Sequence, residues 1–309
     1  MSSADPERHP ATPLQQVMVL DSLREPGTGV NIQQVVFDLP HEVDPERFQA
    51  AWSRLLAEND ALRARFHIGD GDPAVTVDFP ARTQPVPVQS FEWRGSSKAR
   101  QQALFESFLE ADRTTDFEPA VPPLLRATLI ELAPGQHRVV CTFHHAILDG
   151  RSYAELIDRL MVCYERPDAK SASAEAPPYE AFLRWLSERD VEQSRAHWAV
   201  DLGGYEGAEL LSHLGPPSAA SGKGHETLAI TLPPVIAERL RAFCDEHAVT
   251  ANSVMQGLWA ILISRIADVE DIVFGAIVAG RKGHVEGAED TLGMFINTLP
   301  MRAATGGQE

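Results

Sequence analysis

Residues 138–150 read RVVCTFHHAILDG, an apolar run followed by two adjacent histidines, an aspartate and a glycine. The run 138–143 is too short and too rich in β-branched residues for a helix, so it predicts a strand. From Tyr153 onward apolar residues recur at the spacing of an amphipathic helix: Leu156, Ile157, Leu160, Met161 and Tyr164. The His-His-Asp-Gly segment is therefore expected at a strand-to-helix turn, where α/β proteins tend to place their chemistry.

The two histidines of this turn are expected to have different roles. If the strand continues through His144 and His145, their side chains point to opposite faces of the sheet. One imidazole then works and the other is structural. A neutral imidazole is well suited to accept a proton near pH 7, and positioned general base catalysis contributes roughly 100- to 10,000-fold.

The two residues that end the turn have more than one interpretation. Asp149 can cap the following helix or accept an ion pair, and Gly150 permits either a positive φ or a close approach of backbone to substrate. The histidines could equally form a partly buried structural pair. We expect no metal, because no further cluster of His, Cys or Glu with ligand spacing lies nearby in the sequence.

Composition narrows the class of protein. The 309 residues carry 27 basic and 44 acidic side chains, a formal charge of −17, so nucleic acid is not an expected partner. The 44% hydrophobic content is enough to build the core of two domains. Widely spaced cysteines and the lack of an apolar leader or membrane span predict a cytoplasmic protein without disulfides; the cysteines are Cys141, Cys163 and Cys244.

The remaining elements alternate along the chain. Helices are predicted at 48–56, after Asp44-Pro45, and at 104–109, 234–243 and 253–266. Strands are predicted at 35–39, 75–79, 125–132, 226–232 and 272–279; the strand 125–132 should pair with 138–143, and the strand 272–279 should be buried on both faces. Residues 166–178 resemble a linker and 203–224 a loop, which predicts an N-terminal lobe at 1–170 and a C-terminal lobe at 171–309.

The segment from His144 to Gly150 matches the HHxxxDG signature of the condensation-domain superfamily. This superfamily includes condensation domains of nonribosomal peptide synthetases, chloramphenicol acetyltransferase and related acyltransferases. Other segments resemble condensation-domain motifs in family order along essentially the whole chain: 12–18, 58–66, 123–126, 179–185, 277–281 and 292–302. Two departures stand out. Glu58-Asn59-Asp60 replaces the usual Arg-His-Glu, and the chain stops at Glu309, before two further family motifs.

The resemblance implies a mixed α/β (α+β) fold of two lobes, like chloramphenicol acetyltransferase, with the second lobe incomplete and the histidine motif in a channel. It implies amide bond formation, in which an acyl or peptidyl thioester on a donor carrier protein is transferred to an aminoacyl group on an acceptor carrier. No cofactor is then bound directly, because the phosphopantetheine arms belong to the carrier substrates. An adjacent adenylation domain is a further expected partner.

The resemblance also implies roles for individual residues. His145 would be the working base, with His144 as its structural neighbour. Gly150 would leave room for the pantetheine arm and present its N–H to the developing oxyanion. Asn297 would brace the channel through its amide.

Asp149 would form an ion pair that fixes the loop. The resemblance favours Arg281 as its partner, with Arg63 and Arg126 as alternatives. An aspartate paired in this way is not expected to shuttle protons, because breaking a buried pair costs roughly 3 to 5 kcal/mol.

Three alternative functions remain open from the sequence. The first is a free-standing O- or N-acyltransferase that uses CoA or carrier thioesters, although the segment 295–300 favours the peptide-synthetase branch. The second is a non-catalytic, truncated fragment with an inherited motif. The third is an epimerase or cyclase relative on the same scaffold.

Overall fold

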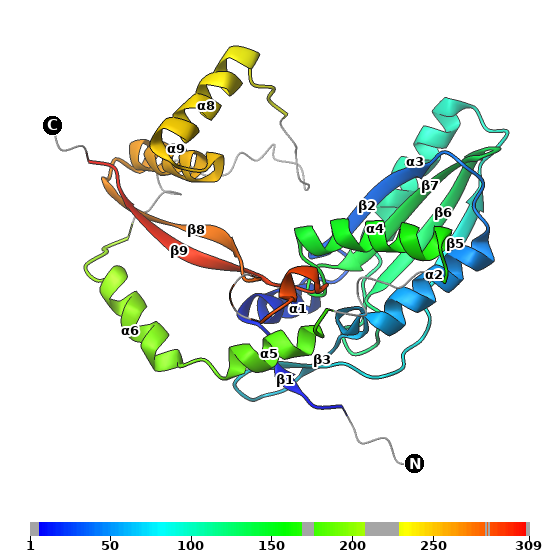
Figure 1. The fold of residues 1–309 in the computed structure, drawn as a ribbon, viewed down its shortest axis with the longest axis horizontal. Helices are drawn as coiled ribbons and strands as arrows, with labels where there is room; N and C mark the ends of the chain where they lie inside the picture. The colour runs from blue at the N-terminus through cyan, green and yellow to red at the C-terminus, as the bar shows by residue number, and fades with distance from the viewer. Residues whose placement is uncertain (1–5, 169–175, 208–228, 282, 284, 307–309) are drawn as a thin grey trace. The chain divides into compact units, whose positions relative to one another are not determined.

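The computed structural model describes residues 6–168, 176–207, 229–281, 283 and 285–306. The chain divides into two compact units (Figure 1). The first comprises Met1–Arg189 and Ala279–Asn297, and the second comprises Asp190–Val278 and Thr298–Glu309. The histidine motif lies in the first unit.

A four-stranded mixed sheet forms the centre of the first unit. Its order is β2-β7-β6-β5, with β5 parallel to β6 and the other pairs antiparallel. The strands are β2 (Ile32–Leu39), β5 (Val88–Glu92), β6 (Leu125–Ala133) and β7 (Gln136–His144). The predicted pairing of the strand 125–132 with the histidine strand is confirmed, and the register places His144 opposite Ile32.

Helices cover both faces of this sheet (Figure 1). Strand alternation sends Leu129 and Val139 into the main core, where α2 (Pro45–Glu58) and α4 (Gly150–Glu165) pack together. The neighbouring side chains Ile130 and Val140 point the other way and pack with Phe105 and other aromatic side chains of and around α3 (Lys98–Arg113). The histidine strand is therefore central and buried on both sides.

The start of α2 follows the predicted signal. The Asp44 side chain accepts hydrogen bonds from the backbone N–H groups of Glu46 and Arg47, at 2.9 and 3.1 Å, and Pro45 is the first helical residue. The apolar stripe of the helix is buried, with Trp52 and Leu55 at 0% exposure. Periodicity and cap together therefore explain where this helix begins and which face it buries.

The first unit extends beyond the boundary expected at residue 170. It also contains α1 (Pro13–Arg24), α5 (Tyr179–Ser187) and a small antiparallel sheet in the order β1-β4-β3, made of β1 (His9–Pro10), β4 (Val75–Asp78) and β3 (Arg65–Ile68). The reason is aromatic packing: the buried Tyr179 ring meets Phe295 edge-on at 5.1 Å and Phe79 at 6.1 Å. Residues 169–175 of the expected linker lie outside the described residues.

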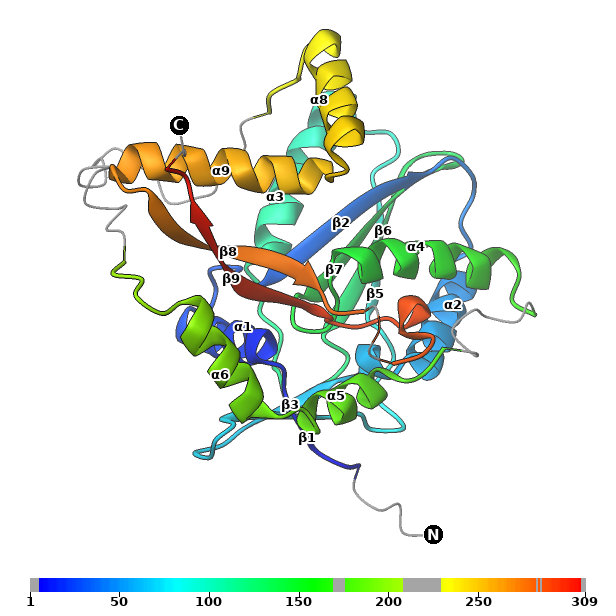
Figure 2. The ribbon, with the colours of Figure 1, turned by 60° about the vertical axis from the view of Figure 1, so that its left-hand side comes forward.

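The second unit contains α6 (Val191–Asp201), α8 (Pro234–His247), α9 (Ala251–Ala267) and most of the hairpin-like pair of β8 (Asp271–Ala279) with β9 (Ile296–Ala304), as Figure 2 shows. Two predictions fail here. Residues 229–232 form no strand, and the rest of that predicted strand lies outside the described residues. The strand β8 is not buried on both faces: Ile272 packs against α9, but Ile277 is 67% exposed. In the described part, β8 pairs only with β9 and one face remains open.

The cysteines Cys141, Cys163 and Cys244 are all free thiols. Cys141 is fully buried in β7, and this burial raises the pKa of its thiol. Among the helices of the described ranges, none combines the length and the apolar character that crossing a bilayer requires.

A matched pair of leucines tests the assignment of the core. Leu55→Ala in α2 removes a fully buried side chain and should lower the free energy of unfolding by about 2 to 5 kcal/mol. Leu23→Ala in α1, where the side chain is 49% exposed, should cost less than about 1 kcal/mol. Urea unfolding of both variants measures the difference, and equal losses would contradict the packing described.

Candidate active site

The turn between β7 and α4 separates the two histidines. The strand ends at His144, the helix begins at Gly150, and the side chain of His144 is buried whereas that of His145 is half-buried. The two neighbouring imidazoles therefore have different surroundings, as the alternation of a strand requires.

Hydrogen bonds fix the tautomer and the charge of His144. The backbone N–H of Ala146 donates to its Nδ1 at 3.1 Å, so Nδ1 carries the lone pair and Nε2–H donates to Ser22 Oγ at 2.9 Å. Burial, reinforced by repulsion from His145, lowers the pKa of His144 to about 4. His144 is therefore a neutral structural residue near pH 7.

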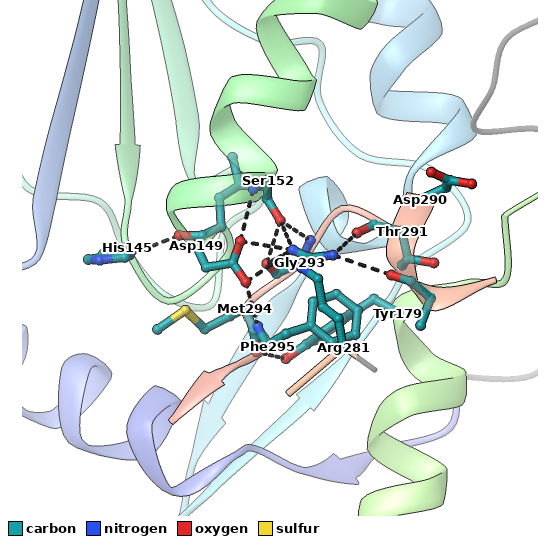
Figure 3. A network of polar contacts seen from close by, with 12 residues as sticks. His145, Asp149, Ser152, Tyr179, Arg281, Asp290, Thr291, Gly293, Met294 and Phe295 are labelled. Carbon is teal, nitrogen blue, oxygen red and sulfur yellow. Dashed lines mark hydrogen bonds and ion pairs between the residues drawn. The ribbon is translucent and has the colours of Figure 1, made fainter. Parts of the chain in front are cut away.

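The ring of His145 is oriented by a different contact. Its Nδ1 lies 2.8 Å from the carbonyl oxygen of Leu148, which can only accept, so in the neutral ring the proton resides on Nδ1. The lone pair is then on Nε2. Figure 3 shows the imidazole directed away from the contacts of Asp149. His145 thus offers a basic nitrogen from a ring whose orientation is fixed.

Asp149 forms a buried ion pair with Arg281 (Figure 3). Nη2 of Arg281 donates to both carboxylate oxygens, at 2.8 and 3.0 Å. The same carboxylate caps α4 through Ser152 N–H at 2.8 Å and accepts from Phe295 N–H at 3.1 Å. Both interpretations of Asp149 from the sequence, helix cap and ion pair, therefore describe contacts that it makes.

The guanidinium of Arg281 is satisfied on all sides. It donates to the carbonyl oxygen of Thr291 and to Ser152 Oγ, and its Cζ lies 4.1 Å from the centre of the Phe295 ring. Ser152 in turn donates to the Gly293 carbonyl at 2.7 Å and accepts from the Gly293 N–H at 3.0 Å. Asp149, Arg281 and Ser152 thus join the histidine turn to the segment 280–295.

Two close contacts complete this junction. The Tyr179 hydroxyl donates to the carbonyl oxygen of Met294 at 2.7 Å, and burial raises the pKa of that hydroxyl. A Cβ at Gly293 would collide with the Tyr179 ring, so this position requires glycine. The segment that carries Arg281 is therefore held from two sides.

Gln15 supports the turn from α1. Its Nε2 donates to the carbonyl oxygen of Ala146 at 2.8 Å, while its Oε1 accepts from the Thr12 N–H in a capping box that starts the helix. The side chain is buried, so both of its polar ends need these partners. The start of α1 and the histidine turn are consequently coupled.

The other residues predicted for the site lie as follows. Gly150 is exposed, has no positive φ, and a Cβ there would meet only Tyr153 at an ordinary 3.9 Å, so space is open in front of it. Asn297 is half-buried in β9, and its predicted role stays a prediction.

Neither alternative partner of Asp149 pairs with it. Arg63 donates to main-chain oxygens at the end of α2 and beyond it, those of Leu56, Ala57, Asn59 and Pro80. Arg126 pairs with Asp112 in a separate ion pair. The prediction of Arg63 as an ion-pair residue is therefore wrong, because the carbonyl groups that a helix leaves without partners use its donors.

Sequence reasoning gave no role to three residues that hold the site: Gln15, Ser22 and Ser152. Gln15 and Ser152 had a detectable signal, since each is a polar residue inside a motif segment next to apolar helical positions. Ser22 had none, because its contact with His144 spans 122 residues. In the described ranges, the groups of His and acidic side chains close enough to share an ion are Glu7, His9 and Glu180, and Glu42, Glu131 and His137. Neither group includes a histidine of the turn.

Solved structures share this fold. The first condensation domain of the calcium-dependent antibiotic synthetase, in complex with a substrate analogue, matches with a TM-score of 0.69 at 22% identity, over 98% of this chain and 71% of that chain. A mutant starter condensation domain of rhizomide synthetase, in complex with C8-CoA, gives a TM-score of 0.70 at 19% identity, over 97% and 66%. The fold is thus the mixed α/β, chloramphenicol acetyltransferase-like fold of condensation domains.

The sequence comparisons define the family. A family model described as Condensation domain matches residues 7–309. A linear gramicidin synthase of Brevibacillus parabrevis is 34% identical over 298 residues, which are 94% of this chain and 6% of that synthase. The chain belongs to the condensation-domain family, and the resemblance found in its motifs is confirmed. It spans only a small share of the synthase that it matches.

Removal of the buried carboxylate should destabilise the first unit. Asp149→Ala leaves Arg281 without its charge partner, and we expect the free energy of unfolding to fall by about 3 to 5 kcal/mol. The control is Asp38→Ala, which removes an exposed pair with Arg138 and should cost less than about 1 kcal/mol. Denaturant unfolding compares the two variants, and equal effects would remove the structural role of the pair.

The neutral state of His144 predicts a pH dependence of stability. Its pKa is about 4 in the folded protein against 6.5 for the free side chain, so between these values the unfolded state binds more protons. Stability should therefore fall as the pH drops from 6.5 towards 4, by up to about 3 kcal/mol from this group. His144→Gln should flatten that slope, whereas His247→Gln, at an exposed histidine, should not. An unchanged slope in His144→Gln would contradict the assignment.

Proposed function

We propose that this chain catalyses amide bond formation between two carrier-bound substrates. The amine of an acceptor aminoacyl group attacks the carbonyl carbon of a donor acyl or peptidyl thioester. The new C–N bond forms, the C–S bond breaks, and the donor phosphopantetheine thiol is released. Both substrates are held on phosphopantetheine arms of carrier proteins, which are the proposed partners together with an adjacent adenylation domain.

The arrangement of His145 is the observation that carries this proposal. As the amine nitrogen attacks, it becomes acidic, and Nε2 of His145 accepts its proton while Nδ1 stays bonded to Leu148. The imidazolium then donates that proton to the departing thiolate. Asp149 takes no part in the transfer, because both of its oxygens accept from Arg281 and from backbone N–H groups.

The start of α4 supplies a place for the developing negative charge. The first N–H groups of a helix have no partner within the helix, and the open space in front of Gly150 admits a carbonyl group. We infer that the Gly150 N–H donates to the oxyanion and that the pantetheine arm passes this glycine. Asn297 is proposed to brace the substrate through its amide.

A CoA thioester is the second candidate donor. The solved starter domain of rhizomide synthetase in complex with C8-CoA favours it, since that protein has the same fold. The two donors share the pantetheine thioester and differ in the carrier protein, so a direct comparison of rates separates them.

Replacement of His145 tests the base. His145→Ala should lower amide formation by at least about 100-fold and leave the unfolding transition unchanged, because the ring makes a single contact with a carbonyl group. Product mass is followed with a carrier-bound acceptor and three donors: the carrier thioester, the CoA thioester and the free acid. The exposed control His247→Ala should keep the wild-type rate.

The outcomes separate the alternatives. A variant His145→Ala that retains the wild-type rate would contradict the base role, and product from the CoA thioester alone would favour the free-standing acyltransferase. Wild-type protein that is inactive with every donor would indicate a non-catalytic fragment. An acceptor released with inverted configuration would instead indicate an epimerase.

A further inference from the structure

We propose that Asn31 is a positioning residue for His145. This inference rests on the function proposed above for His145. The main-chain oxygen of Asn31 accepts the His145 N–H at 2.7 Å. Because β7 ends at His144, this bond extends its ladder with β2 by one residue and fixes the backbone at the working histidine.

Asn31 adopts a conformation that most residues avoid. Its φ of 59° lies in the left-handed region, which Asn tolerates better than other residues with a side chain. The other described non-glycine residues with positive φ, Ala248 and Asp268, end the helices α8 and α9, where this conformation is common. Asn31 instead precedes a strand, and its left-handed turn directs its carbonyl group to His145.

The side chain of Asn31 ties this turn to α1. Its Nδ2 donates to the carbonyl oxygen of Met18 at 3.0 Å and lies 3.4 Å from Ser22 Oγ. Ser22 is also the hydroxyl that accepts from His144. One residue therefore links α1 to the partner of the structural histidine and to the backbone of the working histidine.

These contacts define what position 31 requires. A suitable residue must accept a positive φ and must carry a side-chain donor that reaches Met18. Asn meets both demands, Gly meets the first, and Val meets neither. The three side chains thus separate the effect of the backbone from a general loss of packing.

The test compares Asn31→Val with Asn31→Gly. Asn31→Val should lower kcat about 10- to 100-fold, with KM within about threefold, because the base is misplaced and substrate binding is not. Asn31→Gly should recover most of kcat, since glycine restores the left-handed turn. The matched control is Asp268→Val at the end of α9, which imposes the same backbone change in the second unit and should leave kcat unchanged.

A second readout does not depend on activity. Hydrogen exchange of the His145 amide, followed by NMR, should be slow in wild type and in Asn31→Gly and at least about tenfold faster in Asn31→Val. Wild-type protein that forms no amide but shows this pattern would refute the proposed function and support the positioning role. Wild-type kcat together with slow exchange in Asn31→Val would overturn the inference, as would equal losses of kcat in the Val and Gly variants.

Discussion

The buried ion pair of Asp149 and Arg281 joins two segments that are 132 residues apart in the chain. Removing both charges from water is costly, and their attraction compensates for that cost only when the remaining donors and acceptors are also satisfied. Here they are satisfied, by Ser152, by Thr291 and by the backbone N–H of Phe295. Because every partner sits at a fixed distance, the histidine turn and the segment 280–295 can adopt only one register relative to each other.

This constraint also decides which residue performs the chemistry. A carboxylate that accepts from a guanidinium and from two backbone N–H groups has no lone pair to offer a substrate. The proton must therefore be taken by a neighbour. Of the two imidazoles, His144 uses both nitrogens in buried hydrogen bonds, which leaves Nε2 of His145. Identical side chains at adjacent positions thus acquire different roles from their partners alone.

Local patterns predicted the elements of the first unit well and its contacts poorly. The β-branched run, the helical stripe and Asp44-Pro45 define β7, α4 and α2, because each signal lies within a few residues. Arg281 came from a family resemblance, and Arg63 could not be rejected without knowledge of the carbonyl groups around it. The positive φ of Asn31 left no mark in the sequence, since Asn is common in turns of every kind. The exposure of β8 likewise depends on which strands pair with it.

The partner chosen for His145 suits the proposed nucleophile. In serine hydrolases a carboxylate orients the histidine and stabilises the imidazolium, because an alcohol must lose its proton as it attacks. Here a carbonyl group fixes the tautomer of His145 without placing a full negative charge against the ring. An amine is already nucleophilic and becomes acidic only as the C–N bond forms, so the base has to be correctly placed more than it has to be strong. The concentration of contacts on the backbone and the orientation of His145, rather than on its charge, follows from that difference.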